Sequence, residues 1–172
     1  MESGATTTME QLQVGDSIRT GPNEFGVVYL FSHKDAVRRS TFVSIRTSEN
    51  GSAALEMSPS HYVRLANGEL RRAGSVRVGD ALLDRSNTCV RVSSVDLVVK
   101  RGLFAPHTTA SRGELVVNGH IVSEFTTAVH PLMARILLEP LKTLYRMGAY
   151  QLAGTVHGMG GRSLLASATE SS

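Results

Sequence analysis

Apolar and polar positions alternate with a period of two over most of the first 125 residues, a pattern typical of β-strands with one buried face. Short runs rich in Val, Ile, Leu, Thr and Tyr carry this alternation. They predict strands at Gly26–Phe31, Thr41–Thr47, Ala54–Met57, Tyr62–Leu65, Val90–Lys100, Glu114–Val117 and His120–Phe125. Several short strands at near-regular spacing predict an all-β domain.

Asn-Gly steps separate several of these runs. They occur at Asn50-Gly51, Asn67-Gly68 and Asn118-Gly119. Asn and Gly both tolerate positive φ, so an Asn-Gly step between two β-like runs is the strongest short-range signal for a hairpin. We therefore expect a hairpin at each of these steps.

A short motif occurs twice in the chain. Leu12–Ile18 reads L-Q-V-G-D-S-I and Val76–Leu82 reads V-R-V-G-D-A-L, an offset of 64 positions from Asp16 to Asp80. Each copy predicts a tight turn in which the Asp carboxylate bonds nearby backbone amides before the chain enters a strand. Because the flanks also match, we favour a duplication over chance, with two β subunits related by a pseudo-twofold axis.

The periodicity changes to that of a helix after residue 130. Apolar positions recur three and four residues apart, at Leu132, Met133, Ile136, Leu137, Leu141, Leu144 and Tyr145. His130-Pro131 suits a helix start, Gly148 can end the helix, and Pro140 should kink or split it. We favour packing of this helix on its own domain's core over contact with a membrane surface or a sterol.

These patterns divide the chain into three parts. The β domain is predicted over residues 1–128 and a helical extension over 129–150. Residues 151–172 are small, Gly- and Ser-rich and aperiodic, which predicts a disordered tail.

Composition excludes several classes of protein. The 172 residues are 41% hydrophobic and 19% charged, close to an average globular domain and unlike collagen-like, disulfide-scaffold or disordered chains. No stretch approaches the roughly 18 consecutive apolar residues of a membrane span. The formal net charge is +3 and the pI about 9.4. Because the basic residues are scattered rather than gathered into a stripe, we expect no nucleic-acid partner.

The candidate chemistry centres on one turn. The six histidines fit no metal-ligand spacing and Cys89 is the only cysteine, so we expect no metal and no cofactor. Ser58-Pro59-Ser60-His61 lies between two predicted strands, where a hydroxyl and an imidazole could polarise and protonate one peptide group. From the residues alone, an ordinary surface turn is the more frequent alternative.

This turn, followed by an apolar strand and Asn67-Gly68, resembles the Thr-x-x-His block of the Hint family, which includes hedgehog autoprocessing domains and inteins. Further stretches resemble blocks of the family in the family's order: Met9–Asp16, Tyr29–Asp35, Ala73–Asp80, and Gly102–Thr108 with Gly113–Gly119. The likeness covers about residues 3 to 130 and is greatest to hedgehog-type domains. It implies an all-β Hint-like fold with a pseudo-twofold axis, which would explain the repeat, and a short C-terminal helical extension.

The resemblance also implies an activity. In this family a cysteine at the first position of the domain attacks the preceding peptide carbonyl, and water, a thiol or a sterol then cleaves the thioester. By position, His61 would protonate the departing nitrogen and Ser58 would position the scissile amide, less firmly than Thr because it lacks the methyl group. His33 would be the base for the second nucleophile.

The implied partner is the N-terminal domain of the protein's own precursor, released or transferred by a monomeric domain acting once in cis. The family resemblance suggests a secretory or extracellular location, although the first residues do not read as a signal peptide.

The chain departs from the family pattern at three places. No cysteine stands at the start, Ser123-Glu124-Phe125 replaces the family's Ser-Cys-Tyr, and Thr169–Ser172 lacks the His-Asn pair of splicing inteins. Only cleavage or transfer is therefore expected. We hypothesise that Met1 is an internal methionine and that about ten upstream residues carry the nucleophile (a family expectation), so the chain as numbered would be inactive.

Two alternatives stay open at this point. The first is a degenerate Hint module that is folded but does not process. The second is a small basic β-barrel that binds nucleic acid or protein. With 4 Tyr, 5 Phe and no Trp, the chain has few aromatic side chains on which bases could stack.

Overall fold

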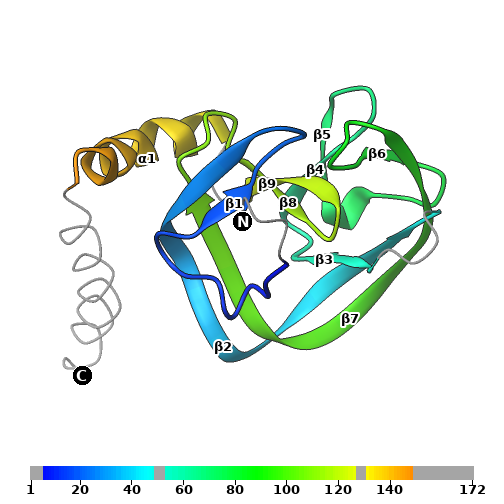
Figure 1. Ribbon diagram of the computed structural model, residues 1–172. Helices are drawn as coiled ribbons and strands as arrows, with labels where there is room; N and C mark the ends of the chain where they lie inside the picture. Colours follow the sequence, from blue (N-terminus) through cyan, green and yellow to red (C-terminus); the bar gives the residue numbers. More distant parts are fainter. Residues whose placement is uncertain (1–5, 49–52, 127–130, 149–172) are drawn as a thin grey trace, which may run out of the picture. The chain divides into compact units, whose positions relative to one another are not determined.

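The computed structural model describes residues 6–48, 53–126 and 131–148 (Figure 1). Residues up to 135 form one unit, which contains the sheets, and residues from 136 form a second. The strands are β1 (Ser17–Arg19), β2 (Phe25–Thr47), β3 (Leu55–Met57), β4 (His61–Arg64), β5 (Leu70–Arg72), β6 (Ala81–Leu83), β7 (Cys89–Thr108), β8 (Glu114–Val117) and β9 (His120–Thr126). A short 3-10 turn covers Ala73–Ser75, and helix α1 covers Pro131–Arg146.

The strands of the first unit form two antiparallel sheets. One sheet has the order β1-β2-β7-β6, with β3 also paired to β2. The other has the order β5-β4-β9-β8. The all-β prediction is confirmed, and the sheets bring β4 and β9 together although they are far apart in sequence.

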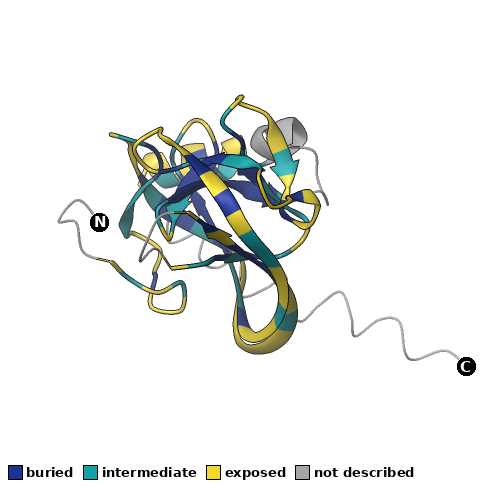
Figure 2. Ribbon diagram, turned by 90° about the vertical axis from the view of Figure 1, so that its right-hand side faces the viewer, coloured by how far each residue is buried: buried dark blue, intermediate teal, exposed yellow. Residues whose placement is uncertain are grey.

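Strands β2 and β7 form one long antiparallel ribbon, which Figure 1 shows running along the first unit. The prediction of two separate strands at Gly26–Phe31 and Thr41–Thr47 is wrong, because β2 is one strand of 23 residues. Its middle, from Ser32 to Arg39, is exposed and carries no alternation that could have marked it as a strand (Figure 2). Register shifts along the ribbon are β-bulges, which bend a strand and increase its twist.

The two ends of β2 enter two apolar clusters. The smaller cluster contains Leu12, Val28 and Phe31. The larger one surrounds the other end of the ribbon and includes Val43, Ile45, Leu55, Met57, Val63, Leu65, Ala73, Val76, Leu82, Val90, Val92, Leu115 and Val122. Burial of these side chains holds β4 and β9 against the ribbon.

The duplicated motif folds twice into the same turn. Gly15 and Gly79 have φ values of +100° and +91°, which an L side chain rarely adopts. The Oδ2 atom of Asp16 accepts a bond from the amide of Gln13 at 2.9 Å, and Oδ2 of Asp80 accepts the corresponding bond at 2.8 Å. The strands that follow pair in equivalent registers, Ser17 with Val27 and Ala81 with Arg91. The turn and its repetition are therefore confirmed.

Two of the expected hairpins are present. Asn67-Gly68 lies in the connection between β4 and β5, and Asn118-Gly119 alone joins β8 to β9. Asn118 and Gly119 have φ values of +47° and +87°, as a two-residue type I′ turn requires. The third expected hairpin, at Asn50-Gly51, lies outside the described residues.

In the C-terminal part, α1 begins at Pro131 as predicted and continues through Pro140 to Arg146. The alternative in which Pro140 splits the segment is wrong, since one missing N–H leaves the backbone bonds of the flanking turns in place. Gly148, at φ +82°, donates to the carbonyl of Tyr145 and ends the helix as expected. No helix among the described residues is long and apolar enough to cross a membrane. The predicted tail lies outside the described residues, and the packing of the helix stays a prediction.

Candidate active site

The Ser58–His61 turn connects β3 to β4 and joins its hydroxyl to its imidazole. The amide of His61 donates to the carbonyl of Ser58 at 3.1 Å, which closes the turn. The amide of Gly74 donates to the carbonyl of Pro59 at 3.0 Å and fixes the turn to the 3-10 segment. In this frame Oγ of Ser58 lies 2.6 Å from Nδ1 of His61 and 3.2 Å from Oγ of Ser60. The residues that the sequence placed on one turn therefore form a hydrogen-bonded pair.

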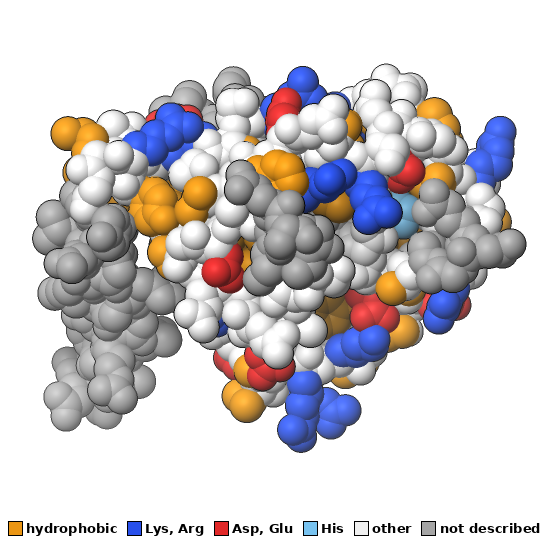
Figure 3. Space-filling view, viewed as in Figure 1, with side chains coloured by type: hydrophobic (Ala, Val, Ile, Leu, Met, Phe, Trp, Pro, Cys, Tyr) orange, Lys and Arg blue, Asp and Glu red, His pale blue; other side chains and the backbone are white. Residues whose placement is uncertain are grey.

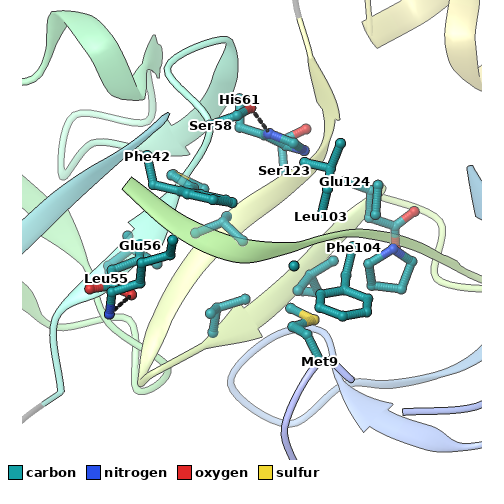
Figure 4. A pocket seen from close by; sticks show the side chains of 18 of the residues that line it. Met9, Phe42, Leu55, Glu56, Ser58, His61, Leu103, Phe104, Ser123 and Glu124 are labelled. Atoms are coloured by element: carbon teal, nitrogen blue, oxygen red, sulfur yellow. Dashed lines mark hydrogen bonds and ion pairs between the residues drawn. The ribbon is translucent and has the colours of Figure 1, made fainter. Parts of the chain in front are cut away.

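This pair lies in the wall of a cavity of about 200 Å³ (Figure 4). Ser123 and Glu124 of β9 lie beside it, and Met9 from the N-terminal segment lies farther along the cavity. Most of the remaining lining is apolar: Phe42, Leu55, Met57, Leu103, Phe104, Ala105, Pro106, Leu115, Val117 and Val122. An apolar wall lowers the local dielectric, so polar groups that meet there interact more strongly than they do in water.

The pKa of His61 is lowered from 6.5 to about 4, and burial of the ring is the largest cause. The nearby charges of His107 and His33 contribute to the same lowering, because each disfavours a second positive charge. His61 is therefore neutral near pH 7 and has one ring nitrogen free to accept a proton. Once protonated it is a stronger acid than an ordinary imidazolium, which suits transfer of that proton to a poor leaving group.

The remaining candidates lie elsewhere. His33 is exposed on β2, opposite Ala105, and does not line the cavity, although its charge reaches His61. Cys89 is exposed at the start of β7 and does not line the cavity either. In the part of the chain that the structure describes, no three His, Cys, Asp or Glu side chains gather as metal ligands.

Sequence reasoning missed a buried acid beside the pair. Glu124 is 5% exposed, and its Oε1 accepts bonds from the amide of Thr108 at 3.0 Å and from the Thr108 hydroxyl. Its Oε2 lies 3.7 Å from Nδ1 of His107, which is also buried. A signal was present, because Glu124 is the one charged acid inside the predicted strand His120–Phe125.

The chain matches the family model described as the Hint module over residues 1–167. The chain belongs to the Hint-module family. Its fold is similar to that of the gp41-1 intein at 16% identity, with a TM-score of 0.56, covering 67% of this chain and 84% of that one. It is also similar to a bacterial intein-like domain from Clostridium thermocellum at 18% identity, with a TM-score of 0.54, covering 67% and 86%.

A third similar structure, the MchDnaB-1 intein, has 15% identity and a TM-score of 0.56, covering 68% of this chain and 88% of that one. At these identities the likeness shows the fold, and it confirms the Hint-like architecture expected from the sequence. The greater closeness of this Hint domain to hedgehog-type members stays a prediction.

The lowered pKa of His61 predicts a loss of stability in acid. Below pH 6.5 the unfolded chain binds a proton at His61 that the folded chain binds only near pH 4, so the free energy of unfolding falls as the pH drops through this window. The loss is at most about 3 kcal/mol. Urea unfolding at pH 7 and pH 4.5 measures it, and His61→Gln should remove most of the pH dependence.

His33→Gln is the matched control, because it removes an exposed histidine and leaves His61 in place. It should keep most of the acid loss. Equal losses in the wild type and His61→Gln would contradict the assignment of the acid sensitivity to His61.

Proposed function

We propose that this Hint domain cleaves the peptide bond preceding it by an N-to-S acyl shift, and that it releases or transfers an N-terminal partner through a thioester. The observation that carries the proposal is the 2.6 Å contact between Ser58 and His61 in the wall of a cavity that the N-terminal segment also lines, at Met9. The family membership and the intein-like fold support the same reaction class.

In the proposed reaction, a cysteine at the start of the domain gives its thiol proton to Nε2 of His61. The thiolate sulfur attacks the preceding carbonyl carbon, and a carbon–sulfur bond forms as the carbon–nitrogen bond breaks. The proton on Nε2 passes to the departing nitrogen, which leaves as an amine. A pKa of about 4 favours the second transfer, since His61 is neutral before the attack and is a strong acid toward the departing nitrogen once it is protonated.

Ser58 is proposed to polarise the amide. If Nδ1–H of His61 donates to Oγ of Ser58, the hydroxyl proton of Ser58 is free to point at the scissile carbonyl oxygen. That hydrogen bond strengthens as negative charge develops on the oxygen, so it lowers the barrier. Ser60, 3.2 Å from Ser58, is the neighbour that can hold the hydroxyl when no peptide is bound.

The second step needs another nucleophile, which is water, a thiol or a sterol. His33 is the proposed base for this step, because its ring is exposed on β2 and can accept a proton from a nucleophile that arrives from solvent. Its role is thus separable from that of His61, which acts on the first step.

The distribution of surface charge argues against binding of nucleic acid, which was the alternative function. On the face in Figure 3, Lys and Arg side chains are interspersed with Asp and Glu rather than gathered into one band. Arg71 illustrates the mixing, since it bonds Asp80 at 2.9 Å and Glu69 at 3.3 Å. A mobility shift on single-stranded or duplex DNA that weakened steeply with salt would instead favour the nucleic-acid alternative.

The proposal is tested with a reporter and a cysteine-initiated segment joined in front of the chain. Addition of a small thiol at neutral pH should release the reporter, because the thiol exchanges with the thioester. The same fusion with Ser in place of that initial cysteine should stay intact. A correctly folded cysteine fusion that also stays intact would favour the degenerate module.

A further inference from the structure

A second hydroxyl and imidazole meet in the first unit, away from the lining of the cavity, and a carboxylate lies behind the imidazole. Oγ of Ser32 lies 3.0 Å from Nε2 of His107. Nδ1 of His107 lies 3.7 Å from Oε2 of Glu124. The order hydroxyl, imidazole, carboxylate is that of a serine nucleophile with its base and its orienting acid.

We propose that Ser32 is an acyl-accepting nucleophile, with His107 as its base and Glu124 as the residue that positions His107. Activated esters and thioesters are the substrate class. The proposal goes beyond the proposed function, because neither the Ser58–His61 pair nor an initial cysteine takes part in it.

The backbone directs Ser32 toward His107. In the ribbon Phe31 pairs with Pro106 and His33 pairs with Ala105, so β2 advances two residues where β7 advances one. Ser32 is the extra residue of this β-bulge, and bulges turn a side chain away from the regular alternation of a strand. The side chain thus lies beside His107 while the residue itself stays exposed and open to a substrate.

The proposed base, His107, and the residue that positions it, Glu124, are both buried, unlike Ser32. His107 and Glu124 are 6% and 5% exposed. Oε1 of Glu124 is held by the amide and hydroxyl of Thr108, which leaves Oε2 facing the imidazole. Among the described residues Nδ1 of His107 is buried without a hydrogen bond, and Oε2 of Glu124, 3.7 Å away, is the acceptor that a proton on Nδ1 would face.

This arrangement favours the reactive tautomer of His107. With the ring proton on Nδ1, toward Glu124, the lone pair on Nε2 faces the Ser32 hydroxyl. Ser32 then has two acceptors, Nε2 at 3.0 Å and the carbonyl of Ala105 at 3.4 Å, and the imidazole is the nearer one. Contacts of such pairs are often long in unliganded enzymes and tighten with substrate.

The proposed step transfers an acyl group to Ser32. The hydroxyl proton moves to Nε2 of His107, and Oγ attacks the carbonyl carbon of the ester. An oxygen–carbon bond forms, the bond to the alcohol or thiol leaving group breaks, and that group departs with the electron pair. The leaving group takes the proton from Nε2, which returns His107 to its neutral form. The product is an ester on Ser32, which water can hydrolyse with His107 acting again as the base.

The experiment uses p-nitrophenyl acetate on the full chain, with peptide mapping of the acetylated residue over time. The internal comparison is Ser93, an exposed serine of β7. Ser32 should be acetylated about 10²-fold faster than Ser93 or more, the contribution of a positioned base. Acetylation of Ser32 no faster than that of Ser93 would overturn the proposal, and this comparison needs no variant.

Variants then separate chemistry from structure. His107→Ala should lower the rate at Ser32 to that of Ser93, and added imidazole should restore part of it. Glu124→Gln should lower the rate as well, because its amide donates to Nδ1 and moves the ring proton to Nε2. Nitrogen chemical shifts of His107 report this change of tautomer. Unchanged rates in both variants, or an unchanged tautomer in Glu124→Gln, would contradict the assigned roles.

Discussion

His61→Asn should slow thiol-triggered release of the N-terminal partner by about 10²- to 10⁴-fold, the usual contribution of a general acid–base group. The attacking thiol would lose the base that takes its proton. The departing nitrogen would lose the acid that protonates it. Asn removes the titrating ring and keeps a polar side chain of modest size. The measurement is the single-turnover rate in the cysteine-initiated reporter fusion, followed by gel electrophoresis.

Variants of the other two candidate residues show which step of the reaction each residue serves. Ser58→Ala should slow release by less than His61→Asn does, while Ser58→Thr keeps the hydroxyl and restricts its rotamer. The threonine variant is expected to be at least as fast as the wild type. His33→Asn should leave thioester formation unchanged and slow only the later transfer. Equal rates of release in the wild type and His61→Asn would remove His61 from the mechanism.

Gly113→Ala should destabilise the domain by roughly 2–5 kcal/mol. Gly113 has a φ of +63°, where a side chain costs about 1–2 kcal/mol. A Cβ there would also lie 2.3 Å from Cε2 of Phe125. The ring of Phe125 is 6% exposed and its centroid is 6.0 Å from that of His107, so it has little room to move.

Gly119→Ala is the control, because Gly119 has a φ of +87° and nothing lies within 4 Å of the position that a Cβ would take. It should cost only the backbone strain, about 1–2 kcal/mol. The difference between the two variants in chemical unfolding isolates the contact with the ring. If both variants lose the same stability, the ring of Phe125 yields to the added methyl group and the predicted clash does not occur.

Local patterns predicted the parts of the fold in which one strand face is buried. Glu114–Val117 was predicted with the bounds that β8 has, and the Asn118-Gly119 turn followed from residue types alone. The centre of β2 could not be predicted in this way. Residues 32–39 are exposed, and the pairing of residues 33–35 and Arg39 with β7 rests on the backbone and leaves no hydrophobic period.

The candidate site residues also divide into those that local sequence brings together and those that meet only through the fold. Ser58 and His61 are three positions apart on one turn, so their meeting was predictable from the sequence. His107 and Glu124 meet because β7 and β9 pass each other, and no spacing in the sequence encodes that approach. A carboxylate inside an apolar strand is the signal that would have directed attention to Glu124, since a buried charge needs partners.

The chemical form of the released partner shows whether the amide bond becomes a thioester. The reporter fusion with its initial cysteine is treated with mercaptoethanesulfonate, and the released reporter is weighed by mass spectrometry. We expect a reporter whose C-terminal carboxyl carries the thiol as a thioester, which hydroxylamine removes. A reporter released with a free carboxylate at the same rate with and without thiol would contradict this expectation.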